Sequence, residues 1–305
     1  SLKPLMSKYL NNLNNALLKK GFAGQFFMVT SQGGVLDMKT SVESPIHLIN
    51  SGPSMAPVGA NFYLKKFKNT KNAIVTDLGG TTFDVSLVKD HKIPRTKETW
   101  IGQKYRGHMT GFPSVDVRSI GAGGGSIAWV DDGGLLHVGP QSSGSNPGPA
   151  CYSTGGNQPT VTDAALVCGI LNPDYFLGGD LKLSQTKAKK AINQIAKKLK
   201  LNTNETAIAI LEVVTENMAQ EIKNLTIHQG FNPVDSALIS GGGASGINIV
   251  SLAKRLDCKL ILIPNLGPVL SAAGAMIADI TNEFSITLPM YTNNFSYSKV
   301  NNTIK

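Results

Sequence analysis

Cysteine, aromatic side chains and long apolar segments are all scarce in this chain of 305 residues. The three cysteines, Cys151, Cys168 and Cys258, are an odd number and form no CxxC pair. Such spacing argues against a disulfide framework and against a cysteine-based zinc site, and it is typical of a protein from the reducing cytoplasm. The longest apolar run, residues 267–278, is too short for a membrane-spanning helix, which needs roughly 18 residues. We therefore expect a globular, cytoplasmic protein that makes no membrane contact.

Acidic residues are also few, since 20 Asp and Glu stand against 29 Lys and Arg and give a net charge of +9. Much of the lysine excess lies between residues 184 and 200, where apolar positions recur with helical spacing. Nucleic-acid-binding surfaces usually add aromatic side chains that stack on bases, and this segment has none. We interpret the lysines as the solvent-facing side of an amphipathic helix and expect no nucleic-acid partner.

Helical and strand patterns alternate along the chain and place it in the α/β class. Helices are predicted over residues 4–20, 51–67, 162–170, 184–200, 203–228, 246–256 and 267–280. Strands are predicted over residues 26–30, 73–77, 83–88, 98–102, 115–120, 126–130, 135–138, 236–240 and 259–263. Residues 139–160 are rich in Gly, Pro and Ser and predict a long loop, whereas residues 291–305 are rich in Asn and Ser and predict a flexible tail.

Two of these helices have features that predict how they begin and pack. Ser51 is the expected N-cap of the helix at residues 51–67. Gly59 in that helix and Gly274 in the helix at residues 267–280 have no side chain. We therefore expect the two helices to cross closely.

The strongest chemical signal is Ala-Ile-Val-Thr-Asp-Leu-Gly-Gly-Thr-Thr-Phe-Asp-Val-Ser-Leu-Val at residues 73–88. A buried strand ends in a tight turn and a second strand returns at once. Gly79 and Gly80 allow positive φ and have no side chain, so backbone N–H groups can approach a phosphate. Thr81 and Thr82 add hydroxyl donors. The segment predicts a phosphate-binding loop, and the alternative is an ordinary β-hairpin with a Gly-Gly turn.

Carboxylates flank this turn. Asp77 precedes it and Asp84 follows it. Carboxylates repel a phosphate unless a cation lies between them, and hydrated Mg²⁺ suits this arrangement. We therefore predict Asp77 and Asp84 as metal ligands and catalytic residues, the alternative being surface aspartates. Asp116 is a third catalytic candidate that would hold metal-bound water, and its alternative is a satisfied turn carboxylate.

Two more glycine clusters are candidates for nucleotide contact. One follows the strand at residues 115–120, and the other lies between a strand and a helix, where N–H groups and the helix dipole favour an anion. Their candidate ligand-binding residues are Gly123, Gly124 and Gly125 in the first cluster, and Gly241, Gly242 and Gly243 in the second. A structural bulge and a plain strand-to-helix turn are the respective alternatives.

The hairpin at residues 73–88 resembles a phosphate loop of the actin-like ATPase superfamily. The other motifs resemble one branch of it, the hydantoinase A/5-oxoprolinase family, and keep that family's order along the chain. They lie at residues 51–60, 116–128, 138–140, 146–152, 159–164, 239–246 and 267–274. The resemblance covers residues 1 to about 280 and matches only the second half of the family's chain.

The resemblance implies a ribonuclease-H-like, actin-type ATPase domain with connecting helices, the first ATPase domain being largely missing. Residues 1–70 would be a remnant of that first domain with a connecting helix, and residues 71–265 the second ATPase domain. A helical insertion would lie near residues 160–230, a second connecting helix at 266–290, and the tail at 291–305. We therefore expect a fragment, whose missing half or a partner subunit completes the cleft.

The resemblance also implies an ATP-dependent hydrolase of cyclic amides that phosphorylates the amide carbonyl oxygen, with ATP and Mg²⁺ as cofactors. Asp77 and Asp84 would orient Mg²⁺-bound water, and Gly79 to Thr82 would hold phosphates. The chain alone is expected to be inactive, and both hetero- and homo-oligomers remain open. The alternatives are an ATP-dependent ketone carboxylase subunit and a non-catalytic module that binds nucleotide or docks a partner.

Overall fold

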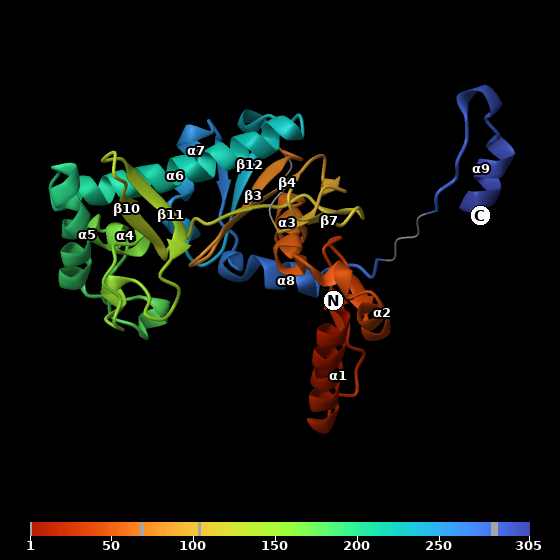
Figure 1. Cartoon of the computed structure of the whole chain (residues 1–305), viewed down its shortest axis with the longest axis horizontal. Helices are drawn as coiled ribbons and strands as arrows, with labels where there is room; N and C mark the ends of the chain where they lie inside the picture. The colour runs from red at the N-terminus through yellow and green to blue at the C-terminus, as the bar shows by residue number, and fades with distance from the viewer. Residues whose placement is uncertain (1, 68–69, 103–104, 282–285) are drawn as a thin grey trace.

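The computed structural model describes residues 2–67, 70–102, 105–281 and 286–305. Its centre is a mixed five-stranded sheet with the order β13-β12-β3-β4-β9 (Figure 1). β12 runs parallel to both β13 and β3, whereas β3, β4 and β9 are antiparallel neighbours. The strands are β3 (Ala73–Leu78), β4 (Phe83–Val88), β9 (Arg118–Ile120), β12 (Ala237–Gly241) and β13 (Leu260–Leu262). The predicted α/β class is confirmed.

Helices cover both faces of this sheet because its strands alternate between two apolar cores. Ile74 and Leu87 face one core, which they share with α6 (Thr203–His228) and α7 (Ile249–Arg255). Val75 faces the other core, shared with α3 (Ser51–Leu64) and α8 (Leu270–Met276). In Figure 1, α6 and α7 lie above the sheet and α8 lies below it.

The close crossing of the two small-residue helices is confirmed. A Cβ on Gly59 of α3 would lie 2.7 Å from the carbonyl oxygen of Leu270, and a Cβ on Gly274 of α8 would collide with the backbone of Met55. Because side chains at these positions would force the helices apart, only glycine permits this contact. The crossing brings the start of α8 close to the end of β3.

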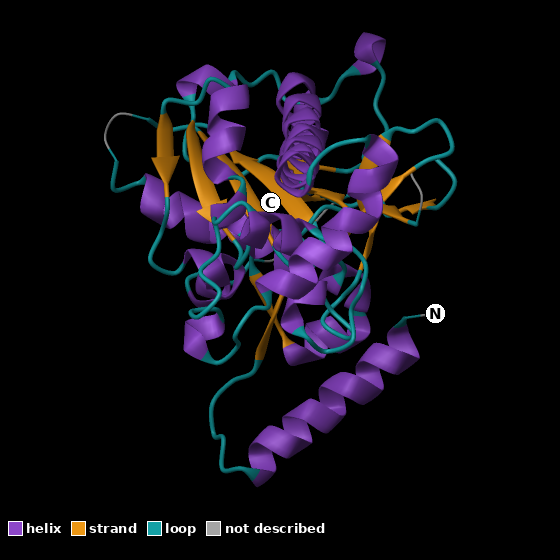
Figure 2. Cartoon of the chain, turned by 90° about the vertical axis from the view of Figure 1, so that its left-hand side faces the viewer, coloured by secondary structure: helices purple, strands orange, loops and turns teal. Residues whose placement is uncertain are grey.

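The remaining elements form smaller units around the sheet. Before the sheet come α1 (Lys3–Lys19), β1 (Phe27–Val29), β2 (Val35–Asp37), α2 (Met38–Glu43) and η1 (Pro45–Leu48). Between β4 and β9 come β5 (Arg95–Thr96), β6 (Trp100–Ile101), β7 (His108–Met109) and β8 (Ser114–Val115). Figure 2 shows α1 lying apart from the layered body, and Leu10 is its one buried residue among those described.

A second group of elements forms the unit on the left of Figure 1. It contains the antiparallel pair β10 (Ser126–Val130) and β11 (Leu136–Ser142), with η2 (Ala150–Tyr152), α4 (Val161–Val167), η3 (Leu177–Gly179) and α5 (Gln185–Leu199). Short turns complete the chain, namely η4 (Pro233–Asp235), η5 (Ser245–Ile247), η6 (Gly267–Val269) and η7 (Thr292–Asn294). Of the long loop predicted at residues 139–160, the first four residues instead extend β11 to Ser142.

Several predicted boundaries are wrong for identifiable reasons. The residue before α3 is Asn50, with φ of 58°, so Ser51 is the first helical residue and not the cap. The strand predicted at residues 115–120 breaks at Asp116, since β8 pairs with β5 while β9 pairs with β4. The predicted tail contains a helix, α9 (Tyr297–Ile304), whose first turn is capped by the Ser296 hydroxyl.

The described residues contain no helix that is long and apolar enough to cross a membrane. The ribonuclease-H-like assignment and the domain boundaries stay predictions. The fold places the ends of β3 and β12, and the start of β4, at one edge of the sheet.

Candidate functional site

The turn between β3 and β4 presents backbone donors that the protein does not use. Leu78 pairs with Phe83, and the Gly79 N–H donates to the Thr82 carbonyl oxygen at 3.0 Å, which closes the turn. Among the described residues, the N–H groups of Gly80, Thr81 and Thr82 find no protein acceptor, and all three residues are exposed. Such a row of free N–H groups favours a bound anion.

Gly79 and Gly80 do not use the positive φ that glycine allows. Added Cβ atoms would also meet little here, since the nearest atom to one on Gly79 is 3.8 Å away and Gly80 has nothing within 4 Å. The protein itself therefore does not require glycine at either position. The space that a side chain would take is open to a ligand.

The glycine cluster at residues 123–125 packs directly against this turn. The Gly124 and Gly125 N–H groups donate to the Gly79 and Gly80 carbonyl oxygens at 3.1 and 2.6 Å. A Cβ on Gly123 would lie only 2.6 Å from the Thr81 nitrogen. These glycines permit close backbone packing and hold the turn in place, and their N–H groups are already used.

The cluster at residues 241–243 completes the arrangement from β12. Gly242 has φ of +86°, which favours glycine, and its N–H donates to the Gly267 carbonyl oxygen at 2.9 Å. A Cβ on Gly241 would lie 2.7 Å from the Thr76 carbonyl oxygen, so this residue serves the packing of β12 on β3. Gly243 has open space around it and faces the cavity described next.

The three glycine segments meet at one cavity of about 530 Å³. Its lining includes the glycines Gly79, Gly80, Gly124, Gly125 and Gly243. It also includes the apolar or aromatic side chains of Tyr152, Ile170, Leu171, Phe176, Leu177 and Ile247. Pockets of this size hold small molecules and cofactors. A molecule that carries both phosphates and a flat apolar group suits this mixed lining.

The apolar side chains that line the cavity were not predicted from the sequence. Leu177 and Tyr152 lie in the short turns η3 and η2, and Phe176 directly precedes η3, so none of them belongs to a segment with clear periodicity. Thr162, at the start of α4, was also missed, and its hydroxyl donates to the Gly124 carbonyl oxygen at 2.7 Å. The motif Thr-Val-Thr-Asp at residues 160–163 was the one available signal for that part of the wall.

Asp77 and Asp84 lie opposite each other on β3 and β4, beside the turn. The Ser271 hydroxyl of α8 donates to Asp77 Oδ2 at 2.9 Å. Burial raises the pKa of Asp84, and the negative charge of Asp77 raises it further, while a hydrogen bond from Ser119 acts in the opposite direction. Two carboxylates that repel each other are a suitable donor set for a divalent cation.

Magnesium fits this pair on chemical grounds. The described residues contain no group of three or more His, Cys, Asp or Glu side chains that would hold a metal by themselves. Mg²⁺ is usually bound by one or two carboxylates together with water and substrate phosphates. The adjacent free N–H groups of the turn are where such phosphates would bind, so Asp77 and Asp84 would hold Mg²⁺ together with a phosphate ligand.

Replacing Asp84 by Asn should raise the melting temperature at pH 7. A carboxyl whose pKa is raised by folding stabilises the protein below its unfolded pKa, and this contribution is lost as pH rises through the folded pKa. At pH 7 the ionised Asp84 therefore costs stability, which the neutral amide avoids. Thermal unfolding from pH 3 to pH 8 checks this, because the gain should disappear at the acidic end. A gain that is the same at every pH would contradict the explanation.

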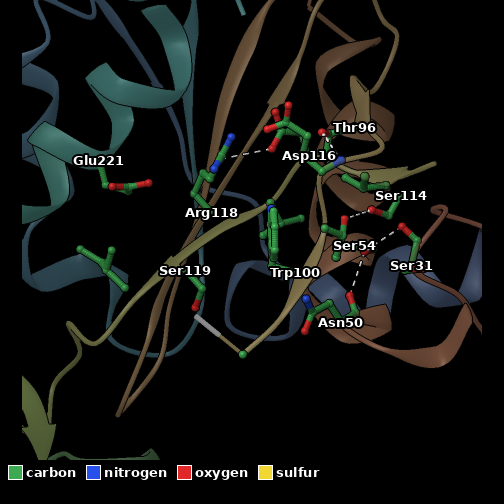
Figure 3. A pocket seen from close by; sticks show the side chains of 16 residues that line it. Ser31, Asn50, Ser54, Thr96, Trp100, Ser114, Asp116, Arg118, Ser119 and Glu221 are labelled. Atoms are coloured by element: carbon green, nitrogen blue, oxygen red, sulfur yellow. Dashed lines mark hydrogen bonds and ion pairs between the residues drawn. The ribbon is translucent and has the colours of Figure 1, made fainter. Parts of the chain in front are cut away.

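Asp116 does not line the cavity beside this turn. It is 3% exposed, Arg118 Nε lies 3.3 Å from its Oδ1, and the Gln229 side-chain amide donates to its Oδ2. Figure 3 shows the pair of Asp116 and Arg118 at a second, more polar cavity of about 340 Å³. The structure thus brings Asp77 and Asp84 together and places Asp116 in a separate, hydrogen-bonded setting.

Comparisons with known proteins agree on one family. The family model described as hydantoinase/oxoprolinase matches residues 1–284. The caprolactamase subunit alpha of Pseudomonas jessenii is 37% identical over 95% of this chain, and the match covers 41% of that protein. The 5-oxoprolinase of Saccharomyces cerevisiae is 32% identical over 92% of this chain, and the match covers 22% of that protein.

Two solved structures of ATP-dependent enzymes are also similar to this chain. The crystal structure of the ATP-dependent caprolactamase from Pseudomonas jessenii matches 92% of this chain and 40% of its own, with a TM-score of 0.80 and 37% identity. The nucleotide-free structure of acetone carboxylase, described as part of ATP-dependent acetone carboxylation, matches 88% of this chain and 37% of its own, with a TM-score of 0.78 and 28% identity. The chain spans about two fifths of each matched chain.

Proposed function

The chain belongs to the hydantoinase/oxoprolinase family, and on that premise we propose that the intact protein is an ATP-dependent hydrolase of cyclic amides. Within it, this chain would carry a nucleotide-binding cavity. The single observation that supports this best is the meeting of three glycine segments, from distant parts of the sequence, at one cavity that apolar side chains also line. A triphosphate would lie at the turn between β3 and β4, and the adenine ring would lie among the apolar side chains.

The residues of the turn would neutralise and orient the triphosphate. The free N–H groups of Gly80, Thr81 and Thr82, with the two threonine hydroxyls, supply donors to phosphate oxygens. Asp77 and Asp84 would hold Mg²⁺, which when bound offsets the charge that develops on the transferred phosphoryl group. Such catalysis depends on positioning and on fixed dipoles rather than on a protein nucleophile.

Phosphorylation makes chemical sense for a cyclic amide. The amide resists hydrolysis because its nitrogen donates electrons into the carbonyl group. In the proposed reaction the carbonyl oxygen forms a bond to the γ-phosphorus while the bond from that phosphorus to ADP breaks. Water then adds to the activated carbon and the ring C–N bond breaks, which leaves an amine and an acyl phosphate. A second water hydrolyses the acyl phosphate, so that ATP, two waters and the amide give ADP, phosphate and an amino acid.

A further portion of chain or a partner subunit would complete the cleft. The chain spans about two fifths of the caprolactamase relative, and that relative is itself named as a subunit. Actin-type ATPases close two domains over one nucleotide, and this chain has one hairpin of the phosphate-loop kind in its sequence. We therefore propose that the isolated chain binds nucleotide weakly and does not turn it over.

Two other functions remain as candidates. The similarity to acetone carboxylase favours an ATP-dependent ketone carboxylase subunit as the second. The single hairpin favours a non-catalytic nucleotide-binding or partner-docking module as the third. ADP release by the full-length protein, measured with a panel of cyclic amides and ketones, separates them. Stimulation by an amide supports the hydrolase, stimulation by a ketone with bicarbonate supports the carboxylase, and nucleotide binding without turnover supports the module.

The mixed lining of the cavity gives a further prediction. Phe176→Ala should weaken ATP binding about tenfold, because an aromatic ring that would contact the base is lost, and leave inorganic tripolyphosphate binding unchanged. Calorimetric titration with the two ligands measures this. Phe62→Ala is a matched control, since Phe62 is exposed on α3 and does not line the cavity. Equal losses for both ligands would show that the ring does not contact the base.

A further inference from the structure

A second cavity lies beside β9, the last strand of the sheet, and it has no place in the nucleotide proposal. It has a volume of about 340 Å³ and is formed by the segment after β1, the start of α3, the β5–β6 region, β8, β9 and one residue of α6. Most of the side chains that line it are polar (Figure 3). This volume lies at the small end of the range for ligand sites and suits a small ring molecule.

Two buried polar atoms at this cavity have no partner within the described part of the chain. They are the Ser31 hydroxyl oxygen and the Trp100 ring nitrogen. Ser31 is 1% exposed, and its backbone carbonyl already accepts from the Val115 N–H at 2.7 Å and from the Ser54 hydroxyl at 3.1 Å. Buried polar groups are normally hydrogen-bonded, so unpartnered ones at a cavity point to a ligand that supplies the bonds.

Arg118 contributes further free donors. Its Nε lies 3.3 Å from Asp116 Oδ1, and within the described chain its two Nη groups have no acceptor. Asp116 is fully engaged, since Gln229 donates to its other oxygen. Glu221 of α6 points toward Arg118 across the cavity (Figure 3). The cavity therefore offers N–H donors and carboxylate acceptors on facing walls.

The charge of the walls selects among ligands. Glu98, Asp116 and Glu221 are acidic and Arg118 is the one basic side chain among the lining residues, which leaves two net negative charges. A ligand with a carboxylate would be repelled by this balance. An uncharged ring with one C=O and one N–H would accept from Arg118 or Trp100 and donate to Glu221.

The cavity also lies next to the carboxylates of the proposed phosphoryl-transfer site. Ser119 lines it and lies directly opposite Asp84 in the pairing of β9 with β4, and Asp84 in turn lies opposite Asp77 beside the turn. We propose that this cavity binds the phosphoryl acceptor, and that the acceptor is an uncharged cyclic amide rather than one that carries a carboxylate. This inference rests on the proposed function and adds to it a location, a set of contacts and a charge preference.

Two ligands that share one ring test the proposal. 2-Pyrrolidinone and 5-oxoproline differ by a single carboxylate, and each is titrated into this chain without nucleotide. The chain has two tryptophans, so a Trp129→Phe variant leaves Trp100 as the one fluorescent indole. We expect pyrrolidinone to change the Trp100 emission and to bind at least tenfold more tightly than 5-oxoproline.

Changing the wall charge separates the charge effect from a general loss of binding. Glu221→Gln keeps an acceptor oxygen and should raise 5-oxoproline affinity about fivefold while leaving pyrrolidinone affinity within twofold. Glu43→Gln, on the exposed end of α2, is the control and should change neither. No Trp100 response to pyrrolidinone, equal affinity for both ligands, or no effect of Glu221→Gln overturns the proposal.

A separate titration with Mg-ATP distinguishes failure of the acceptor-cavity proposal from failure of the proposed ATP-dependent function. If Mg-ATP binds and pyrrolidinone does not, the acceptor cavity is wrong and the nucleotide cavity stands. If pyrrolidinone binds with the expected charge preference and Mg-ATP does not, the cavity is a ring-binding site and the ATP-dependent function falls.

Discussion

Gly80→Val should lower the affinity of the chain for Mg-ATP about 100-fold without lowering its melting temperature. A Cβ added at Gly80 meets nothing in the protein within 4 Å, and the residue does not have positive φ, so we expect the fold to tolerate the change. The same side chain would occupy the space in which phosphate oxygens approach the N–H groups of Gly80 and Thr81. Losing about two hydrogen bonds to a charged group costs roughly 3 kcal/mol, which corresponds to that fold-change.

Calorimetric titration and thermal unfolding of the same preparation measure both parts of this prediction. Gly52→Val is the matched control, because Gly52 on α3 also has nothing within 4 Å and does not line the nucleotide cavity. It should leave Mg-ATP binding unchanged. Unchanged binding in Gly80→Val would mean that the phosphates do not lie at this turn.

Asp77→Asn should remove most of the effect of Mg²⁺ on ATP binding. We expect Mg²⁺ to strengthen ATP binding by the unchanged chain, and this increase should fall at least tenfold in the variant, because one of two carboxylate ligands is lost. The amide oxygen still accepts from the Ser271 hydroxyl, which bonds Asp77 Oδ2 at 2.9 Å, so the local packing is kept. ATP affinity measured with Mg²⁺ and with a chelator gives the comparison.

Asp132→Asn is the control for the charge change alone, since Asp132 is exposed and lies outside both cavities. It should leave the Mg²⁺ effect as it is. The assignment of Asp77 as a metal ligand fails if Mg²⁺ increases ATP affinity by the same factor in Asp77→Asn and in Asp132→Asn. In that case the carboxylates beside the turn would have a structural role only.

Local signals allowed much of the fold to be predicted. The α6 helix begins and ends as expected, because Asn202 and Glu205 form a capping box at its start. The hairpin at β3 and β4 was also expected, since a buried strand, a Gly-Gly turn and an alternating strand are each visible within sixteen residues. These elements are determined by residues close together in the sequence, so their signals can be recognised in one sequence without knowledge of the fold.

Small residues allowed the close crossing of α3 and α8 to be predicted, but three other features that depend on distant contacts were not predicted. The break at Asp116 arises because β8 pairs with Arg95 and Thr96 while β9 pairs with β4. The glycines at residues 123–125 look like a ligand-binding loop in the sequence. In the structure, the Gly124 and Gly125 N–H groups donate to the hairpin of β3 and β4, and the Gly123 N–H donates to the Ser126 hydroxyl. The second cavity joins Ser31, Trp100 and Glu221, and no spacing rule connects positions so far apart.

The central claim is that the turn between β3 and β4 binds the phosphates of ATP. Backbone amide NMR of this chain during titration with Mg-ATP tests it most directly. We predict that the largest shifts occur at the Gly80, Thr81 and Thr82 amides, which are free in the structure, and that the Gly124 and Gly125 amides, already bonded to the turn, shift less. Binding that leaves the three free amides unchanged, or no shift at any of them with Mg-ATP in large excess, would contradict the claim.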